Sequence, residues 1–161
     1  MTAPSTCGLS SEARNLQWLL SNLVEEVPGV HSVTVVSSDG LMLLSSDPGH
    51  RTAAAAEPAP PSGPRGSGAD LATIVSGIGS LTAGAATLME GGGVKQTMVT
   101  MEEGSVFVMS ISDGSLLGVH AAPDCDMGVV AYHMALFVGR AGHVLTPELR
   151  RELRTSLESA R

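Results

Sequence analysis

The residues best suited to chemistry in this chain lie close together after residue 119. His120, Asp124, Cys125 and Asp126 bring an imidazole, a thiol and two carboxylates into one short stretch. Such side chains ligate zinc, but a zinc site usually repeats its ligands in C-x-x-C or H-x-x-x-H pairs, and none accompanies them. The two aspartates precede an apolar stretch with helical spacing, where carboxylates cap a helix. We therefore predict helix capping and no metal site.

Other catalytic patterns are also missing. The run from Gly91 to Lys95 looks like a phosphate-binding loop, but it lacks G-x-x-x-x-G-K-[ST] and follows a predicted helix instead of preceding one. The sequence has no G-x-S-x-G motif. His133 lies among apolar residues, and Glu102 and Glu103 occupy a predicted turn where water solvates them. We expect no catalytic residue, no cofactor and no enzymatic activity.

The composition excludes nucleic acid as a partner. The 161-residue chain has 9 basic and 16 acidic residues, a net charge of −7, whereas phosphates require clustered lysine and arginine. One tryptophan, one tyrosine and two phenylalanines offer no platform for base stacking. With two cysteines and no signal-peptide pattern, the chain is predicted to be cytoplasmic and reduced, reaching a membrane only through partners.

Alternating apolar and β-branched residues predict a hairpin followed by a three-stranded meander. The predicted strands are residues 30–36, 41–46, 94–101, 105–112 and 115–122. Asp39-Gly40 and Asp113-Gly114 favour two-residue type I′ turns, in which both residues have positive φ. Gly104 is predicted to take a left-handed conformation after Glu102 and Glu103.

Four helices are predicted from apolar residues at helical spacing and from capping residues. They cover residues 11–27, 70–90, 127–142 and 146–160. The first is expected to lie on the sheet with Trp18 at its edge, although its apolar face could instead bind a partner. The order is helix, hairpin, helix, meander, helix and tail helix, which is an α+β fold with helices on both faces of a five-stranded antiparallel sheet.

The chain divides into three parts. Residues 1–10 are predicted to be a flexible N-terminus, residues 11–142 the folded domain, and residues 143–161 an amphipathic C-terminal helix. Within the domain, residues 47–68 hold five of the nine prolines and show no apolar periodicity. We predict that this stretch is a mobile insert, although its PAPP sequence could also bind as a polyproline ligand.

The helix over residues 70–90 is unusual because it carries no charge between its ends. It is long enough to span a membrane, but its hydroxyl residues, its glycines and the flanking Asp70 and Glu90 argue against insertion. One stripe is apolar and is expected to lie on the sheet: Leu71, Ile74, Ile78, Leu81, Ala85 and Leu88. The opposite stripe consists of small residues, which let another helix approach closely.

The residues after this helix predict an edge strand whose unpaired backbone groups invite pairing. We therefore predict a twofold homodimer built from the uncharged helix and the strand that follows it. The predicted interface residues are Ala72, Thr73, Ser76, Ser80, Ala83, Gly84, Thr87, Val94, Gln96, Met98 and Thr100.

Two long segments of the sequence resemble bacterial Roadblock/LC7 domains. They run from Leu16 to Leu43 and from Asp70 to Val138, and they contain VPGV, two SDG turns, a glycine run after the long helix, and AAPD-x-D. The resemblance covers the whole domain apart from the insert. It is closest to the actinobacterial group encoded beside Ras-like small GTPases.

The resemblance implies a profilin-like fold and a homodimer with paired second helices and joined third strands. It also implies a non-catalytic signalling role, as a regulator or scaffold of a Ras-like GTPase, sometimes stimulating hydrolysis, with a sensor-kinase-like protein as a further partner. No arginine finger is assigned. The candidate partner-binding residues are Lys95, Arg140, Arg150, Arg151 and Arg154. The alternative is a small-molecule-sensing, PAS-like module, which would need a roomy pocket with a few polar groups.

Overall fold

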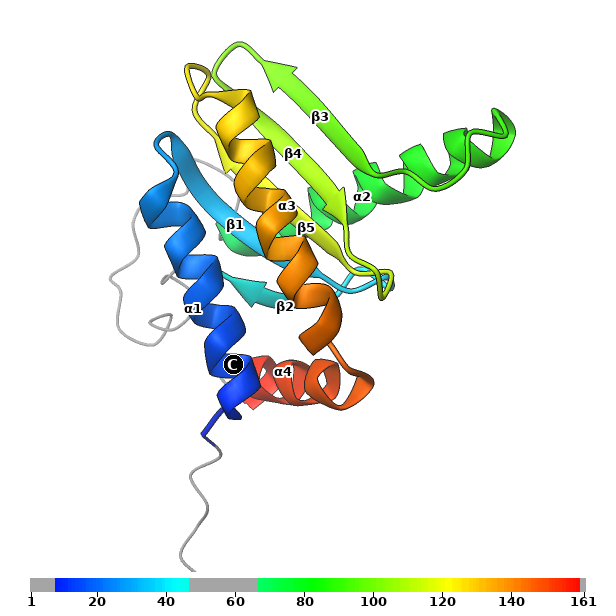
Figure 1. The fold of residues 1–161 in the computed structure, drawn as a ribbon. Helices are drawn as coiled ribbons and strands as arrows, with labels where there is room; N and C mark the ends of the chain where they lie inside the picture. The colour runs from blue at the N-terminus through cyan, green and yellow to red at the C-terminus, as the bar shows by residue number, and fades with distance from the viewer. Residues whose placement is uncertain (1–7, 47–66, 160–161) are drawn as a thin grey trace, which may run out of the picture.

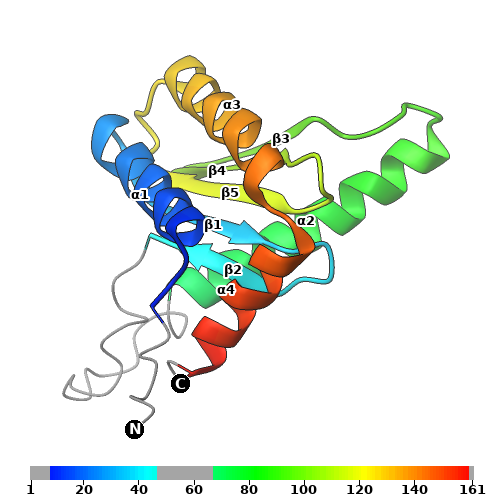
Figure 2. The same cartoon turned by 60° about the horizontal axis from the view of Figure 1, so that its bottom comes forward.

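A single five-stranded antiparallel sheet organises the computed structural model, which describes residues 8–46 and 67–159. The elements are α1 (Ser11–Glu26), β1 (Val30–Val36), β2 (Met42–Ser45), α2 (Ser67–Leu88), β3 (Gln96–Met101), β4 (Gly104–Ser110), β5 (Leu116–Ala121), α3 (Met127–Val144) and α4 (Pro147–Ser159). The strand order is β2-β1-β5-β4-β3, with β5 in the middle and β3 at an edge. Helices α1 and α3 cover one face and α2 crosses the other (Figures 1 and 2). The predicted α+β fold and element order are confirmed.

Two predicted segments fall largely outside the described residues. They are the first seven residues of the N-terminal segment and residues 47–66 of the proline-rich insert. Helix α2 begins at Ser67, so the last two residues of the predicted insert belong to the helix.

Helix α1 forms as its sequence dictates. The Ser10 hydroxyl accepts a hydrogen bond from the Ala13 N–H at 3.3 Å, which satisfies one free donor of the first turn. Leu16, Leu20 and Leu23 are buried on one face. The helix ends at Val27, which is extended because the following residue is proline.

The two Asp-Gly turns have a different geometry from the predicted one. Gly40 and Gly114 have φ of +85° and +90°, but neither aspartate has a positive φ. The glycine N–H groups bond to the carbonyls of Ser37 and Ile111, three residues earlier. These are longer hairpin loops, with a type I turn followed by a left-handed glycine, so the type I′ prediction is wrong.

Gly104 also departs from prediction, because it does not have a positive φ. A Cβ atom there would lie 3.1 Å from the Ala121 carbonyl oxygen and 3.2 Å from His120 Nε2. The glycine is therefore favoured by close packing against β5 and not by turn conformation.

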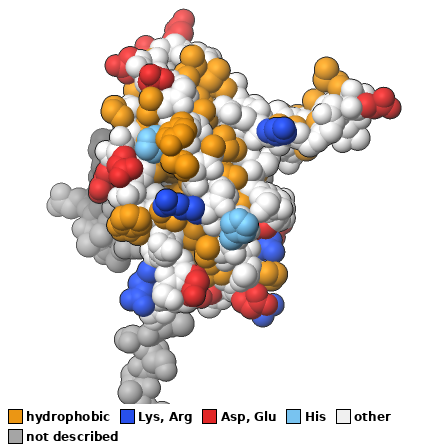
Figure 3. Space-filling model, in the orientation of Figure 1, with side chains coloured by type: hydrophobic (Ala, Val, Ile, Leu, Met, Phe, Trp, Pro, Cys, Tyr) orange, Lys and Arg blue, Asp and Glu red, His pale blue; other side chains and the backbone are white. Residues whose placement is uncertain are grey.

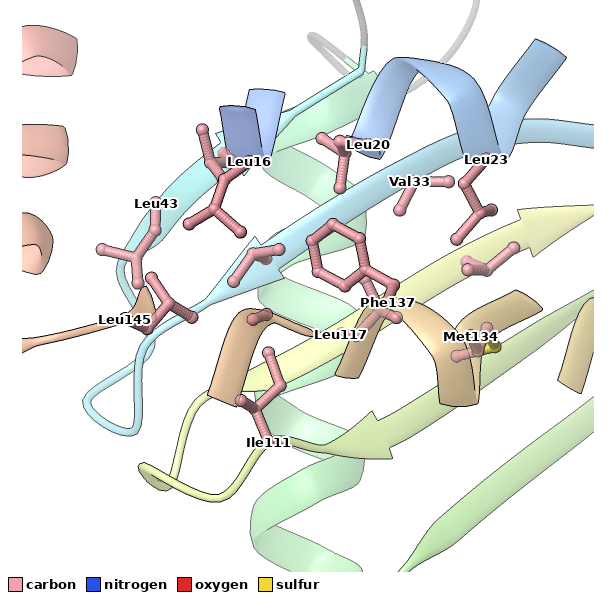
Figure 4. Packing of buried hydrophobic residues seen from close by; sticks show 14 of the residues in the cluster. Leu16, Leu20, Leu23, Val33, Leu43, Ile111, Leu117, Met134, Phe137 and Leu145 are labelled. Carbon is pink, nitrogen blue, oxygen red and sulfur yellow. The ribbon is translucent and has the colours of Figure 1, made fainter. Parts of the chain in front are cut away.

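The sheet has a hydrophobic core on each face. The larger core lies under α1 and α3 and includes Phe107, Leu117, Met134 and Phe137 (Figure 4). The smaller core lies under α2 and contains Val36, Leu71, Ala72, Val75, Val106 and Val108. The buried residues of α2 in this smaller core all lie in the first half of the helix, so that half holds α2 to its own domain.

Helix α4 folds back onto the domain. Its Leu149 and Leu153 are buried in the larger core. The Arg154 guanidinium bonds to both carboxylate oxygens of Asp39 at 2.7 and 2.9 Å, and Arg150 Nε lies 3.7 Å from the Asp113 carboxylate. Two arginines of α4 thus contact the two Asp-Gly turns, at the end of the sheet where both hairpins close.

The neighbours of the Asp39 carboxylate lower its pKa. The hydrogen bond from the Ser37 hydroxyl lowers the pKa of Asp39, and the charge of Arg154 lowers it further. A carboxyl with a lowered pKa contributes stability above its unfolded pKa, and this is lost as the pH falls through its folded pKa. Since Asp39 is exposed, we expect this contribution to be small and sensitive to salt.

Truncating Leu153 is therefore expected to cost much more stability than truncating Arg154. Leu153 is 2% exposed, so Leu153→Ala should lower the free energy of unfolding by about 2–5 kcal/mol. Arg154→Ala removes an exposed ion pair and should cost about 0.2–1 kcal/mol. Urea denaturation measures both. Equal losses would show that the Arg154 ion pair contributes as much as Leu153 to the docking of α4.

Candidate functional site

Strand β3 forms an exposed edge of the sheet. It pairs with β4 from Gln96↔Met109 to Met101↔Gly104, and no other described strand pairs with it. Its side chains are largely exposed on both faces. Val99 lies opposite Val106 of the smaller core, so Val99 projects from the face that α2 crosses. The edge therefore presents both unpaired backbone groups and uncovered apolar side chains.

Helix α2 contacts the sheet through a side on which Gly79 faces β5. A Cβ atom on Gly79 would lie 2.4 Å from a methyl of Leu116, and one on Gly118 would lie 2.2 Å from a methyl of Val75. Two glycines, one on the helix and one on β5, thus let helix and sheet come very close. The C-terminal part of α2 continues past the edge of the sheet (Figure 1).

This contact confirms only part of the predicted orientation of the apolar stripe, because Leu71 and Ile78 pack on the sheet as expected. The stripe was expected to lie on the sheet, but Leu81 is 78% exposed and Leu88 is 87% exposed. The helical spacing places Ile74, Leu81 and Leu88 on one flank of α2, beside the side that contacts the sheet. We call these three residues the apolar flank. It projects into solvent.

The other flank of α2 carries small residues and borders a cavity of about 260 Å³ between the helix and the sheet. Its lining includes hydroxyls from Ser76, Ser80 and Thr82 on the helix and from Thr97 and Ser110 on β3 and β4. Ala83 and Val94 complete this side of the cavity.

The predicted interface residues are thus distributed over several surfaces. Ala72 is 4% exposed and packs in the smaller core, so its own sheet occupies it and the interface prediction for this residue is corrected. Those on α2 that remain exposed are Thr73, Ser80, Ala83, Gly84 and Thr87, with Ser76 half-buried. On the edge, Gln96, Met98 and Thr100 are exposed and Val94 is half-buried. Met98 lies opposite Phe107 and so faces the α1 and α3 side of the sheet.

Comparison with known proteins identifies the domain. The Roadblock/LC7 domain family matches residues 63–121, which contain α2 and strands β3 to β5. A crystal structure of a Roadblock/LC7 domain from Streptomyces avermitilis has a TM-score of 0.64 and 29% sequence identity, covering 81% of this chain and 98% of that chain. This chain carries a Roadblock/LC7 domain.

More distant structures share the fold. The gliding protein MglB from Thermus thermophilus has a TM-score of 0.66 at 17% identity, covering 89% of this chain and 97% of that chain. Myxococcus xanthus MglB has a TM-score of 0.64 at 12% identity, covering 81% of this chain and 94% of that chain. The sequence matches no curated protein.

The uncharged helix of the Roadblock/LC7 domain is only partly covered by its own chain. Among the described residues, the window Leu71–Leu88 alone is long and apolar enough to cross a membrane, and 17% of it is buried within the chain. Its first turns contribute Leu71, Ala72 and Val75 to the smaller core. The first turns of α2 therefore dock on the domain's own sheet, while Leu81 and Leu88 in its second half stay exposed.

The five candidate partner-binding residues differ in availability. Arg150 and Arg154 contact aspartates of their own domain. Lys95 is exposed just before the edge strand, Arg151 is exposed on α4, and Arg140 is exposed near the end of α3. Lys95 is therefore the one nearest the α2 and β3 surface.

Among the chemistry-bearing residues around position 120, Asp126 has a structural role. Asp126 accepts hydrogen bonds from the Gly128 and Val129 N–H groups at 2.9 and 3.2 Å, which confirms it as the cap of α3. Across residues 8–46 and 67–159, no three His, Cys, Asp or Glu side chains are grouped closely enough to hold a metal. The His120 ring lies 5.3 Å from that of His31, and burial, followed by the charge of His31, lowers the pKa of His120.

Sequence reasoning missed one surface, formed by α1 and α3. Trp18 was expected at the edge of a buried stripe, and His133 was expected in the core, but Trp18 is exposed and His133 is half-buried. The available signal was the absence of charge in α3 between Asp126 and Arg140. That pattern was interpreted as a core-facing helix alone.

Proposed function

We propose that this Roadblock/LC7 protein is a cytoplasmic, homodimeric and non-catalytic regulator or scaffold of a Ras-like small GTPase. The observation that supports it most is the open α2 and β3 surface of a domain whose sequence resembles GTPase-associated relatives. That surface combines an uncharged helix, an edge strand and exposed apolar side chains. It has the character of an interface between protein chains.

The edge strand supports twofold pairing. Two copies of β3 running antiparallel would satisfy each other's free N–H and C=O groups and join the two sheets into one. A twofold axis also places the same residues of both copies together, so a single apolar surface is enough. Exposed Val99, on the α2 side of β3, would then be close to the joined edge.

The apolar flank of α2 supports the same axis. Ile74, Leu81 and Leu88 project from the helix at spacings of seven residues, on one side of it. In a dimer joined at β3, the two α2 helices would cross the same face of the continuous sheet. Each apolar flank would then bury against the partner's helix. The small-residue flank would stay beside the cavity between α2 and its own sheet.

The proposed partner class follows from the resemblance. Relatives encoded beside Ras-like GTPases regulate or recruit them without catalysing a reaction of their own. The exposed Lys95, just before the edge strand, would lie near the dimer axis and is the first cation to test. The gliding protein MglB shares the fold.

The test is binding of the purified dimer to each Ras-like GTPase encoded beside its gene, loaded with GDP or with a non-hydrolysable GTP analogue. We expect binding that prefers one nucleotide state and weakens in Lys95→Glu but not in Arg14→Glu, which changes an exposed arginine of α1 on the other face of the sheet. Hydrolysis measured with and without the dimer distinguishes stimulation from recruitment. A dimer that binds no such GTPase in either state would exclude the GTPase role and leave the dimer intact.

The hydroxyl-lined cavity favours a second candidate function, a small-molecule sensor. Its volume of about 260 Å³ is below the roughly 300–1,000 Å³ of most ligand sites. A metabolite that remains bound to the native protein after purification, found by mass spectrometry, and released in Ser80→Leu would favour the sensor. An empty protein would favour the GTPase regulator.

A further inference from the structure

Helices α1 and α3 border a groove on the face of the sheet opposite α2. The groove has a volume of about 230 Å³ and is lined mainly by Leu19, Asn22 and Glu26 of α1 and by His133, Leu136 and Arg140 of α3. In Figure 3, which has the orientation of Figure 1, hydrophobic side chains gather over this face. This surface is separate from the α2 and β3 interface.

The chain's single tryptophan and single tyrosine both lie on this face. Trp18 is 57% exposed and Tyr132 is 62% exposed. Trp18 precedes Asn22 by one helical turn, and Tyr132 precedes Leu136 by one turn, so each aromatic residue shares a helix face with a residue that lines the groove. Exposed tryptophan and tyrosine beside an apolar groove are typical of the anchor residues of protein interfaces.

Charges mark the two ends of the groove. Arg140 is exposed, and it makes no ion pair with any residue in the described part of the chain. Glu26 accepts only a long hydrogen bond of 3.4 Å from the Asn22 amide among those described residues. Between Asp126 and Arg140, α3 carries no charged residue. The groove is therefore lined by apolar side chains along its middle, with Arg140 at one end and Glu26 at the other.

We propose that this groove binds an amphipathic helix of a partner protein, with a carboxylate of that helix paired to Arg140. A helix is the convex shape that fits between two helices, with apolar residues at helical spacing packed against Leu19 and Leu136. The unpaired Arg140 selects for an acidic side chain at its end of the stripe, and Glu26 selects for a basic side chain at the other end.

The chain's own described elements do not fit the groove as well. Two copies related by a twofold axis through this surface would place the two grooves opposite each other, and neither groove would be filled. Helix α4 already buries Leu149 and Leu153 in its own core, and α2 lies on the other face of the sheet. The occupant is therefore a different protein. This inference does not depend on the GTPase role.

The single tryptophan makes the test specific to the groove. The probe is a synthetic helical peptide of about 18 residues, long enough to form a helix, with leucines on one face, glutamates beside them at the end that meets Arg140 and a lysine at the end that meets Glu26. A matched peptide has lysine in place of each glutamate. Titration into the full chain, followed by Trp18 emission, should show saturable, blue-shifted fluorescence with the glutamate peptide and at least about tenfold weaker binding of the lysine peptide.

Variants assign the effect to the groove. Tyr132→Ala and Leu136→Glu should each weaken the glutamate peptide by at least about tenfold, as expected for interface anchors. Arg140→Glu should reverse the preference between the two peptides, whereas Arg151→Glu should leave it unchanged. Leu81→Glu, on the opposite face, should bind the glutamate peptide as the wild type does.

Three results would overturn the proposal. Trp18 emission that neither peptide changes would show that the groove does not accept a helix. Equal affinity for the two peptides would remove the role of Arg140. Trp18 emission that shifts on dilution without peptide would show that a second copy occupies the groove.

Discussion

A Leu81→Glu variant is expected to be monomeric under conditions in which the wild-type protein is a dimer. Leu81 lies on the apolar flank of α2 and is largely exposed within one chain. In the proposed dimer, the substitution would bury a carboxylate in each copy against apolar side chains. An unpaired buried charge costs several kcal/mol, and each 1.4 kcal/mol weakens association about tenfold. The dimer should therefore weaken by at least about 100-fold.

Light scattering and sedimentation at micromolar concentration measure the effect. Leu136→Glu is the matched control, because it changes an exposed leucine to the same residue on the opposite face, and it should remain dimeric. Because Leu81 is exposed in one chain, circular dichroism of Leu81→Glu should show an intact fold. A wild-type protein that is monomeric at this concentration would refute the dimer.

A substitution at the neighbouring Ser80 tests which flank of α2 forms the dimer contact. Ser80 precedes Leu81 but lies on the flank of small residues, and we first predicted the interface there from the sequence. If the helices pair through the apolar flank, Ser80→Glu should weaken the dimer much less than Leu81→Glu. The reverse order would restore the small-residue flank as the contact.

Gly118→Ala is expected to destabilise the domain strongly, because α2 crosses β5 at this glycine. The added Cβ atom would lie 2.2 Å from Val75 Cγ2, and Val75 is fully buried. Either α2 must move away from the sheet or Val75 must leave its packed position. Overpacking of this kind costs about 1–3 kcal/mol of the free energy of unfolding.

A double-mutant cycle tests whether the contact with Val75 is the cause. Val75→Ala alone should cost about 2 kcal/mol through loss of packing. In Gly118→Ala/Val75→Ala, the new methyl group occupies space that the valine vacated. The loss of unfolding free energy in the double variant should therefore be smaller than the sum of the two single losses by about 1 kcal/mol or more. Urea denaturation provides the four free energies. Strict additivity would show that the two residues do not meet.

Gly77 supplies the control for this cycle. It lies in the same helix, and a Cβ atom there would meet nothing within 4 Å. Gly77→Ala should therefore stabilise the domain by about 0.5–1 kcal/mol, since alanine loses less backbone entropy in a helix. Gly118→Ala should also weaken the dimer because it displaces the apolar flank.

Much of the fold was predictable because the relevant signals are local. The apolar spacing of Leu16, Leu20 and Leu23 marks α1, and the cap at Asp126 marks the start of α3. The alternation in residues 94–122 marks the meander. Each of these signals depends on neighbours within a few positions, so the chain's own periodicity and capping residues determine the elements and their order.

The turn geometry was only partly predictable. Asp39-Gly40 and Asp113-Gly114 correctly mark where the two hairpins reverse. Whether the aspartate or only the glycine adopts positive φ depends on which residues pair across the strands. That pairing is a property of the assembled sheet.

The tertiary structure alone decided which side of α2 meets the sheet. A helix without charged residues looks buried on every side, so its larger stripe was assigned to the core. Gly79 and Gly118 instead permit so close an approach that the slim side fits best, and Leu81 and Leu88 project outward. The sequence by itself determined the elements, the edge strand and the uncharged helix. It could not determine the exposed flank or the groove beside Trp18, because exposure depends on what other parts of the chain cover.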